Sequence, residues 1–220
     1  MDIKSYISKH FNKSDLSPSV SCVSSSVHLR FELGLGFDNG TLERVNQGVA
    51  RAAVLFEELF QPDDLIWLLI KSSQSREDAK EFFAPTSGYL EKQFEHFDAI
   101  EKRVYQETIE DFCETVDANN QPVMTDFTRI HSQQFFCQKV SNINYQNIFR
   151  GVANLEMGLE PAIGDIIYFV NPRNHIAFYV YDDRGCILYA AEKDTLRSLY
   201  IKYNHWLVDY HRATFDRLFS

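Results

Sequence analysis

Three short groups of polar residues have side chains suited to chemistry, and the most compact is Asp182-Asp183-Arg184. Adjacent carboxylates suit a hard divalent cation, and an arginine can hold an anionic group through two parallel hydrogen bonds. Neighbouring strand residues point to opposite faces, however, so two such carboxylates seldom meet at one ion. With Gly185 behind them, the same residues are typical of a tight turn, which is the interpretation we favour. Arg184 could then also pair with Asp209 and lock the last helix to the strands.

The second group, His28, Arg30 and Glu32, alternates with apolar residues over positions 27–33. This alternation predicts a half-buried strand. On its polar face Glu32 or His28 could accept a proton while Arg30 holds an anion, although a solvated strand face is the simpler interpretation. The candidates for a catalytic site are Arg30, Glu32, Asp182, Asp183 and Arg184.

The third group, His205, Asp209 and His211, contains metal-ligand types. On a helix His205 and Asp209 would share a face, whereas His211 would point elsewhere, and no H-E-x-x-H motif is present. The sequence also lacks the G-x-S-x-G and G-x-G-x-x-G motifs, and its four cysteines are scattered. It therefore predicts no metal and no cofactor.

The C-terminal part is rich in aromatic residues, with seven of the eleven tyrosines lying beyond position 165. Some must pack in the core, and any that lie exposed would form a good protein-binding surface. The candidate binding residues are Tyr203, Trp206, Asp209, Tyr210 and Arg212.

Hydrophobic spacing predicts the main elements of the N-terminal half. Apolar residues every three or four positions predict an amphipathic helix over about 41–60, ended by Pro62. A continuous apolar run over 65–70 predicts a strand covered on both faces. The order strand, helix, strand favours a crossover that places 65–70 beside 27–33.

Residues 165–191 predict a three-stranded antiparallel meander, with turns at 171–174 and 182–185. We expect Gly185 to supply a positive φ at the second turn. Further helices are expected over 3–11, over 142–157 with Gly158 as its C-terminal cap, from a cap at Asp194 or Thr195 to Asn204, and over 211–219.

Residues 76–117 are acidic, with 12 Asp and Glu against 5 Lys and Arg. Short helices are expected over 76–83 and 89–97, 104–112 fits neither period, and 127–140 has the composition of a strand that pairs with it. We predict one α+β domain spanning 1–220, in which 76–117 could be an insertion. Its sheet is mixed or antiparallel, ends in the C-terminal meander, and is packed by the helix at about 41–60 and by C-terminal helices.

Residues 165–219 resemble a bacterial family known as domain of unknown function 3885. The matching motifs are Ile167-Tyr-Phe-Val-Asn171, Tyr181-Asp-Asp-Arg-Gly185 and Leu196-x-x-Leu-Tyr200-x-x-Tyr203-x-x-Trp206-x-x-Asp209-Tyr210-x-Arg212, together with Arg30-Phe-Glu-Leu-Gly34 upstream. The resemblance implies a bacterial protein and transfers no activity and no catalytic residues.

The net charge of −9 is uneven, because residues 173–217 are close to neutral. No basic stripe favours nucleic acid, and no apolar run is long enough to cross a membrane. The start of the chain has no apolar signal-peptide core, so we expect a cytoplasmic protein.

The leading functional hypothesis is a non-enzymatic protein that binds another protein, with a basic partner favoured by the acidic segment. One concrete form is an immunity-like or antitoxin-like inhibitor. The alternative is a small hydrolase or nucleotide-processing enzyme whose carboxylates and arginines converge on a cleft. A structural subunit with one extensive exposed apolar patch is a third hypothesis. The oligomeric state stays open.

Overall fold

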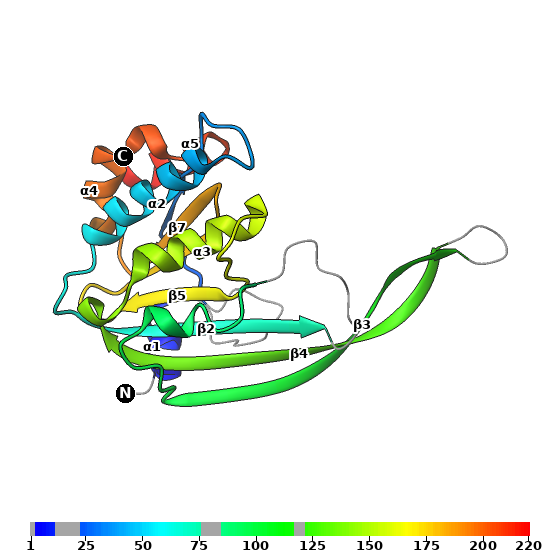
Figure 1. The fold of residues 1–220 in the computed structure, drawn as a ribbon. Coiled ribbons are helices and arrows are strands. Elements are labelled where there is room, and N and C mark those ends of the chain that lie inside the picture. Colours follow the sequence, from blue (N-terminus) through cyan, green and yellow to red (C-terminus); the bar gives the residue numbers. More distant parts are fainter. Residues whose placement is uncertain (1–2, 12–22, 76–84, 117–121) are drawn as a thin grey trace.

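The computed structural model describes residues 3–11, 23–75, 85–116 and 122–220. Within these ranges the chain forms a seven-stranded sheet in the order β1-β7-β6-β5-β2-β4-β3, with every neighbouring pair antiparallel (Figure 1). The strands are β1 (His28–Glu32), β2 (Leu65–Ser75), β3 (Glu101–Val116), β4 (Pro122–Lys139), β5 (Ile166–Asn171), β6 (Ile176–Asp182) and β7 (Gly185–Ala190). The helices are α1 (Ile3–His10), α2 (Leu42–Glu57), α3 (Tyr145–Met157), α4 (Asp194–Lys202) and α5 (Arg212–Phe219). The α+β class predicted from the sequence is confirmed.

Helices cover the two faces of the sheet unequally. Figure 1 shows α2 and α3 on one face, and α1 on the other. The larger core also receives residues of α4 and α5 and lies on the side of α2 and α3. The predicted helix at about 41–60 is confirmed: Thr41 accepts a hydrogen bond from the Arg44 amide at its start, and Val45, Ala52 and Phe56 are buried on one stripe.

Strand β2 lies inside the sheet and contributes to both cores. Ile66 and Leu68 belong to the core under α2 and α3, whereas Leu69 belongs to the core under α1, with Trp67 packed against it. Since side chains alternate along a strand, an uninterrupted apolar run fills both sides. The prediction of a strand covered on both faces is confirmed.

The expectation that β2 lies beside β1 is wrong. β1 pairs with β7, and β2 pairs with β4 and β5, so β5, β6 and β7 separate the two strands. The three strands of the C-terminal meander fill the space between them. Helix α2 therefore connects two strands across the width of that meander, and local sequence order says little about such neighbours.

The meander is confirmed as β5, β6 and β7, but the reason for Gly185 is different from the one expected. Gly185 is not among the residues with positive φ. It lies opposite Glu32 on β1, where an added Cβ would be 2.5 Å from the Phe31 carbonyl oxygen and closer still to the Tyr181 hydroxyl. Glycine is required there because backbone and side chain approach too closely for any other residue.

The middle of the chain is dominated by one long hairpin. β3 pairs with β4 over almost its whole length, which confirms that 127–140 pairs with 104–112. Residues 89–97 contain only the 3-10 turn η1 (Glu91–Gln93), so the expected helix is wrong; Phe94 leaves the turn to form a bridge with Ile143. The helix expected over 76–83 falls outside the described residues.

The C-terminal helices occur where the sequence predicts them. α3 ends at Gly158, which has a φ of 65° and serves as the expected C-terminal cap. α4 buries Leu196 and Leu199, but its N-cap is Lys193 without a side-chain hydrogen bond, so the expected cap at Asp194 or Thr195 is wrong. The chain then passes through the 3-10 turns η3 (Asn204–Trp206) and η4 (Asp209–His211), and α5 confirms the last predicted helix.

Helix α1 is attached to the second face of the sheet by a cluster of rings. The Tyr6 hydroxyl is hydrogen-bonded to His175 Nδ1 at 2.6 Å, and the His10 ring stacks on the His175 ring with a centroid distance of 4.1 Å. Tyr6 also packs edge-on against Trp67. Two imidazoles stacked in this way are stable together only while they do not both carry charge.

No helix in the described part of the chain is long and apolar enough to span a membrane.

Two glycine substitutions separate helix propensity from crowding. In Gly48→Ala the new Cβ would make ordinary contacts, 3.6 Å from the Asp183 carbonyl oxygen and 3.7 Å from Leu33, inside α2. We expect it to raise the free energy of unfolding by up to about 1 kcal/mol. We expect Gly185→Ala to lower the same quantity by about 1–3 kcal/mol. Urea unfolding of both variants checks this, and a tolerated Gly185→Ala would contradict the close approach.

Acid should loosen helix α1. Burial, followed by repulsion from His175 and Lys9, lowers the pKa of His10 from its usual 6.5. A lowered histidine pKa stabilises the fold above pH 6.5, and this contribution is lost as the pH falls through the folded-state pKa. In a Trp206→Phe background, Trp67 fluorescence should therefore change with a midpoint below 6.5. The change should shrink in His10→Gln, and an unaltered transition in that variant would argue against the stacked pair as its cause.

Candidate functional site

The turn between β6 and β7 holds the most prominent candidate residues, Asp182, Asp183 and Arg184. Asp182 is buried, and its Oδ1 accepts a hydrogen bond of 2.7 Å from the Arg184 amide. Its Oδ2 accepts from Arg184 Nε at 2.7 Å and from the Arg184 Nη2 group. Arg184 itself is exposed, and its hydrogen bonds with Asp182 raise its pKa. The turn interpretation of these residues is confirmed.

Asp183 is also buried but has a different partner. Its Oδ2 forms an ion pair with Arg44 Nε on the first turns of α2. The same guanidinium donates through Nη1 to the carbonyl oxygens of Gly34, at 3.1 Å, and Phe37, at 2.9 Å. The two adjacent carboxylates are thus each occupied by a separate arginine and do not converge on a common ligand.

Arg30 and Glu32 lie on β1, near the same end of the sheet. Arg30 Nε donates to the Tyr181 hydroxyl at 2.9 Å, and its guanidinium lies 4.8 Å from the centre of the Tyr181 ring. Burial raises the pKa of Tyr181, and the hydrogen bond from Arg30 opposes this. Glu32 contributes its carbonyl oxygen to Arg51 Nη1 on α2, at 3.1 Å. These contacts are those of a packed sheet edge.

The five candidates for a catalytic site therefore lie at one end of the sheet, and none of them lines the groove described below. The charges of Asp182 and Asp183 each lie against an arginine, and Arg30 is engaged by Tyr181. The groove described below lies at another part of the surface. This geometry provides no open position where a substrate would meet both a carboxylate and an arginine.

The alternative pairing of Arg184 with Asp209 does not occur. Asp209 lies 3.4 Å from Arg212 Nη2 instead, because Arg184 is bound to Asp182. Arg212 also donates to the Asn204 carbonyl oxygen at 2.7 Å and to the Leu207 carbonyl oxygen at 3.2 Å. It therefore fastens the two 3-10 turns that precede α5.

The aromatic candidates of the C-terminal part divide between core and surface. Tyr203 is buried, its hydroxyl donates to Glu58 at 2.8 Å, and its ring stacks on Trp206. Burial and the Glu58 carboxylate raise the pKa of Tyr203. Trp206 is half-buried beneath the Arg51 guanidinium, 5.1 Å from its ring centre. Tyr210, in contrast, is exposed, as is Asp209.

A second network, centred on the partly buried Asp64, was not anticipated from the sequence. Arg173 approaches both carboxylate oxygens, with Nε 2.7 Å from Oδ1 and Nη2 2.9 Å from Oδ2. The Asn171 side chain and the Gln61 amide each donate to Oδ2 at 2.8 Å. Burial would raise the pKa of Asp64, but these hydrogen bonds prevail and lower it. The network joins the β5–β6 turn to the start of β2 and has a structural role.

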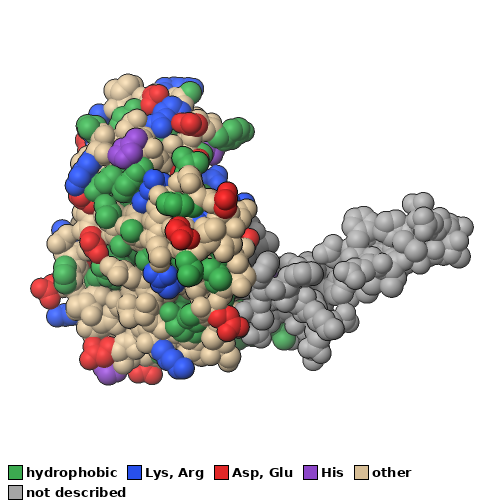
Figure 2. Space-filling view, turned by 45° about the horizontal axis from the view of Figure 1, so that its top comes forward, with side chains coloured by type: hydrophobic (Ala, Val, Ile, Leu, Met, Phe, Trp, Pro, Cys, Tyr) green, Lys and Arg blue, Asp and Glu red, His purple; other side chains and the backbone are tan. Residues whose placement is uncertain are grey.

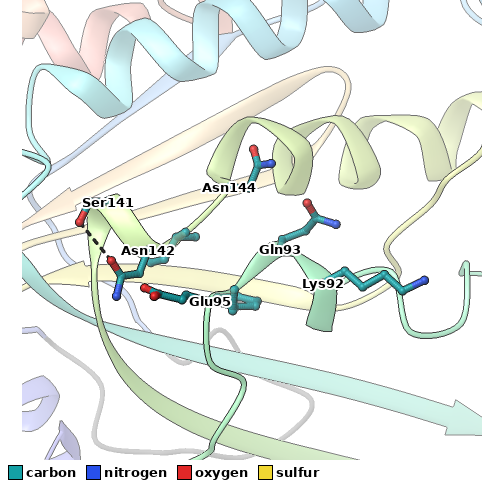
Figure 3. Close-up of a pocket in the computed structure, with 8 residues that line it drawn as sticks. Lys92, Gln93, Glu95, Ser141, Asn142 and Asn144 are labelled. Carbon is teal, nitrogen blue, oxygen red and sulfur yellow. Dashed lines mark hydrogen bonds between the residues drawn. The ribbon is translucent and has the colours of Figure 1, made fainter.

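The described residues form no metal site, and one groove lies on the surface of this part of the chain. No three His, Cys, Asp or Glu side chains there are placed to hold a metal ion together. A shallow, open groove of about 540 Å³ lies between η1 and the start of α3 (Figure 3). Its lining is Lys92, Gln93, Phe94, Glu95, Ser141, Asn142, Ile143 and Asn144. Figure 3 shows the Lys92 side chain extending away from Asn142.

Comparison with known proteins agrees with the C-terminal motifs. The family model described as "Domain of unknown function (DUF3885)" matches residues 3–211. The chain belongs to this family. It is also similar to the uncharacterized protein YnaE of Bacillus subtilis (strain 168), with 24% identity over 228 residues, covering 96% of this chain and 99% of the relative. No solved structure matches. Membership extends the resemblance from the C-terminal third to nearly the whole chain.

The buried Asp183–Arg44 ion pair can be tested with a double-mutant cycle. Removing Arg44 in Arg44→Met would leave an uncompensated buried carboxylate and should lower the free energy of unfolding by about 3–5 kcal/mol. Asp183→Asn should also destabilise, and the double variant should cost less than the sum of the two by about 1–3 kcal/mol. Lys139→Met is the control: in its pair with Asp63 the side chains are 56% and 96% exposed, so we expect a loss of at most about 1 kcal/mol. Strict additivity in urea unfolding would contradict the coupling.

Proposed function

We propose that the protein acts by binding another protein and that its main contact is the outer part of the β3–β4 hairpin. This outer part, residues 108–116 and 122–128, is called the arm here. β2 pairs with β4 only as far as Ser75 opposite Arg129, so beyond that point the two strands of the arm pair, among the described strands, with each other alone. Figure 1 shows the arm extending well away from the body of the molecule. That projection is the observation that carries the proposal.

A two-stranded ribbon is marginally stable by itself, and no third strand or helix of the described ranges is paired with the arm. A long ribbon therefore contributes little stability to the fold unless a partner covers it. Among the described strands β3 is paired on one side only, so the backbone groups along its outer side are available. An exposed strand edge is a template for an extended segment of another protein.

The sequence of the arm indicates which partner is favoured. Residues 108–128 contain five Asp and Glu and no Lys or Arg. Strong one-sign charge disfavours pairing of two copies of the arm and speeds association with a basic protein. An immunity-like or antitoxin-like inhibitor that covers the basic active site of a toxin is one concrete form of this function.

Apolar side chains at the base of the hairpin support the same proposal. Ile100, directly before β3, is 72% exposed, and Val104, within the strand, is 60% exposed. Both apolar residues are therefore exposed to solvent close to the start of the hairpin. An apolar contact next to a charged one is the usual combination at protein interfaces.

The location we propose is the cytoplasm. Cys137 and Cys186 are free thiols, and burial raises the pKa of both. Buried free cysteines behave as small apolar residues and are common in reducing compartments.

The rival hypotheses receive less support. Of the residues in the enzyme hypothesis, Asp182, Asp183, Arg184 and Arg30 are engaged with structural partners. On the face shown in Figure 2, apolar side chains lie among acidic and basic ones and do not form one extensive patch of the kind expected for a structural subunit.

Affinity capture from host extract tests the proposal. The tagged chain should retain one basic protein in stoichiometric amount, and the complex should weaken as salt is raised. Glu110→Gln with Glu114→Gln should reduce the capture severalfold, because both acids lie on the β3 half of the arm. Glu160→Gln with Glu192→Gln removes the same charge from exposed positions elsewhere and should leave the capture unchanged. Recovery of the bait alone, or equal loss in both double variants, would count against the arm.

A further inference from the structure

The connection between β1 and α2, residues 34–42, presents apolar side chains to solvent and is called the apolar loop here. Leu35 is 62% exposed, Phe37 42% and Leu42 60%. They are three of the large exposed apolar residues of the described chain and fall within eight positions. Scattered exposed apolar residues need no explanation, but a local group of this kind marks a contact surface.

Side chains of α2 hold the backbone of the apolar loop. Arg44 Nη1 donates to the carbonyl oxygens of Gly34 and Phe37, and Gln47 Nε2 donates to those of Leu33, at 2.9 Å, and Leu35, at 2.8 Å. Arg44 is in turn fixed by the buried ion pair described above. These bonds occupy the loop's carbonyl groups while its apolar side chains remain outside.

Two further contacts fix the second half of the loop. Thr41 Oγ1 donates to the Asp38 carbonyl oxygen at 2.7 Å, and the Gly40 amide donates to Met157 Sδ at the end of α3, at 2.9 Å. Gly36 and Gly40 have positive φ values of 97° and 78°, which glycine adopts without strain. The loop is thus anchored to both α2 and α3.

This arrangement is not explained by the start of α2 alone. A helix cap requires Thr41, which accepts from the Arg44 amide, and it requires nothing of Leu35 or Phe37. Holding a loop in one conformation while its apolar side chains stay in water lowers the entropic cost of later burial against a partner. Rigid apolar residues of this kind are typical anchors at the centre of an interface.

Charges around the apolar loop indicate the chemistry of the partner. Asp38 directly follows Phe37 and Glu43 directly follows Leu42; both are exposed, and neither takes part in an ion pair within the described parts of the chain. The charge of Arg44 is already neutralised by Asp183. A second copy of the chain would bring Asp38 and Glu43 against their own counterparts across a two-fold axis, which is unfavourable.

We propose that the apolar loop inserts Leu35, Phe37 and Leu42 into an apolar pocket bordered by Lys or Arg side chains on a partner protein. This inference rests on protein binding as the function of the chain, but it does not rest on the arm. It assigns a second contact surface whose specificity comes from a fixed backbone and from the exposed carboxylates that follow Phe37 and Leu42.

Selection of phage-displayed random peptides on the purified full-length chain tests this inference even while the partner is unidentified. The enriched peptides should combine apolar residues with Lys or Arg. Their affinity should fall at least about tenfold in Leu35→Ser with Phe37→Ser, since apolar anchors carry most of an interface's affinity. Asp38→Asn with Glu43→Gln should weaken binding and reduce its dependence on salt.

Matched variants keep the result interpretable. Leu65→Ser with Ile201→Ser alters two residues that are also exposed, at other places on the surface, and should leave peptide affinity and the melting temperature unchanged. The arm variant Glu110→Gln with Glu114→Gln should also bind the loop-selected peptides normally. The inference would be overturned by selected peptides that are acidic, or by peptides whose affinity is the same for Leu35→Ser with Phe37→Ser as for the unaltered chain. A dimer in sedimentation velocity that Leu35→Ser with Phe37→Ser abolishes would also overturn it.

The failure of this inference is distinguishable from failure of the proposed function. If host-protein capture depends on the arm and not on Leu35 or Phe37, protein binding stands and the apolar loop loses its role. If neither set of variants changes the capture, both proposals fall.

Discussion

The ion pair between Asp183 and Arg44 is the interaction on which the geometry of one whole end of the molecule depends. It joins the β6–β7 turn to α2, and through Arg44 it also fixes the backbone of residues 34–37. Burying two charges is costly, and apolar residues of similar volume would often stabilise a fold as well. The ion pair is explained if its role is to fix the position of the neighbouring backbone rather than to stabilise the fold. A single guanidinium can hold a carboxylate and two carbonyl groups at once.

Local sequence patterns predicted most helices and strands. They could not predict which strands pair when the partners are distant in the sequence. The alternation of apolar and polar residues identified β1, and apolar residues spaced three or four positions apart identified α2. Turn-forming residues identified the meander. The neighbours of β2 could not be predicted, because β4 and β5 come from distant parts of the chain and any apolar strand could have filled either place. The expected helix at 89–97 failed for the same reason: Phe94 is recruited by Ile143, a partner that no local pattern reveals.

The candidate site shows the same division between local and distant information. Asp182 and Arg184 are two positions apart, so turn chemistry could be predicted from their types alone. Asp183 and Arg44 are separated by 139 positions, and nothing in the spacing of either residue indicates the other. Tyr203 and Tyr210 are both tyrosines of the C-terminal part, yet Tyr203 is buried against Glu58 at the end of α4 and Tyr210 is exposed within η4. The signal that could have identified the apolar loop was the pair of apolar residues between glycines at 34–40.

The two proposed contact surfaces differ in how they would meet a partner. The arm is a ribbon with one strand edge open, and its interaction is carried by backbone groups and charge, which tolerate variation in the partner's sequence. The apolar loop is fixed by at least four side-chain hydrogen bonds, and so its fit to a pocket is sensitive to shape. Charge on the arm would govern the rate of encounter, whereas burial of Leu35 and Phe37 would govern the lifetime of the complex. A protein with both surfaces can attract many basic partners and retain only the one whose pocket fits.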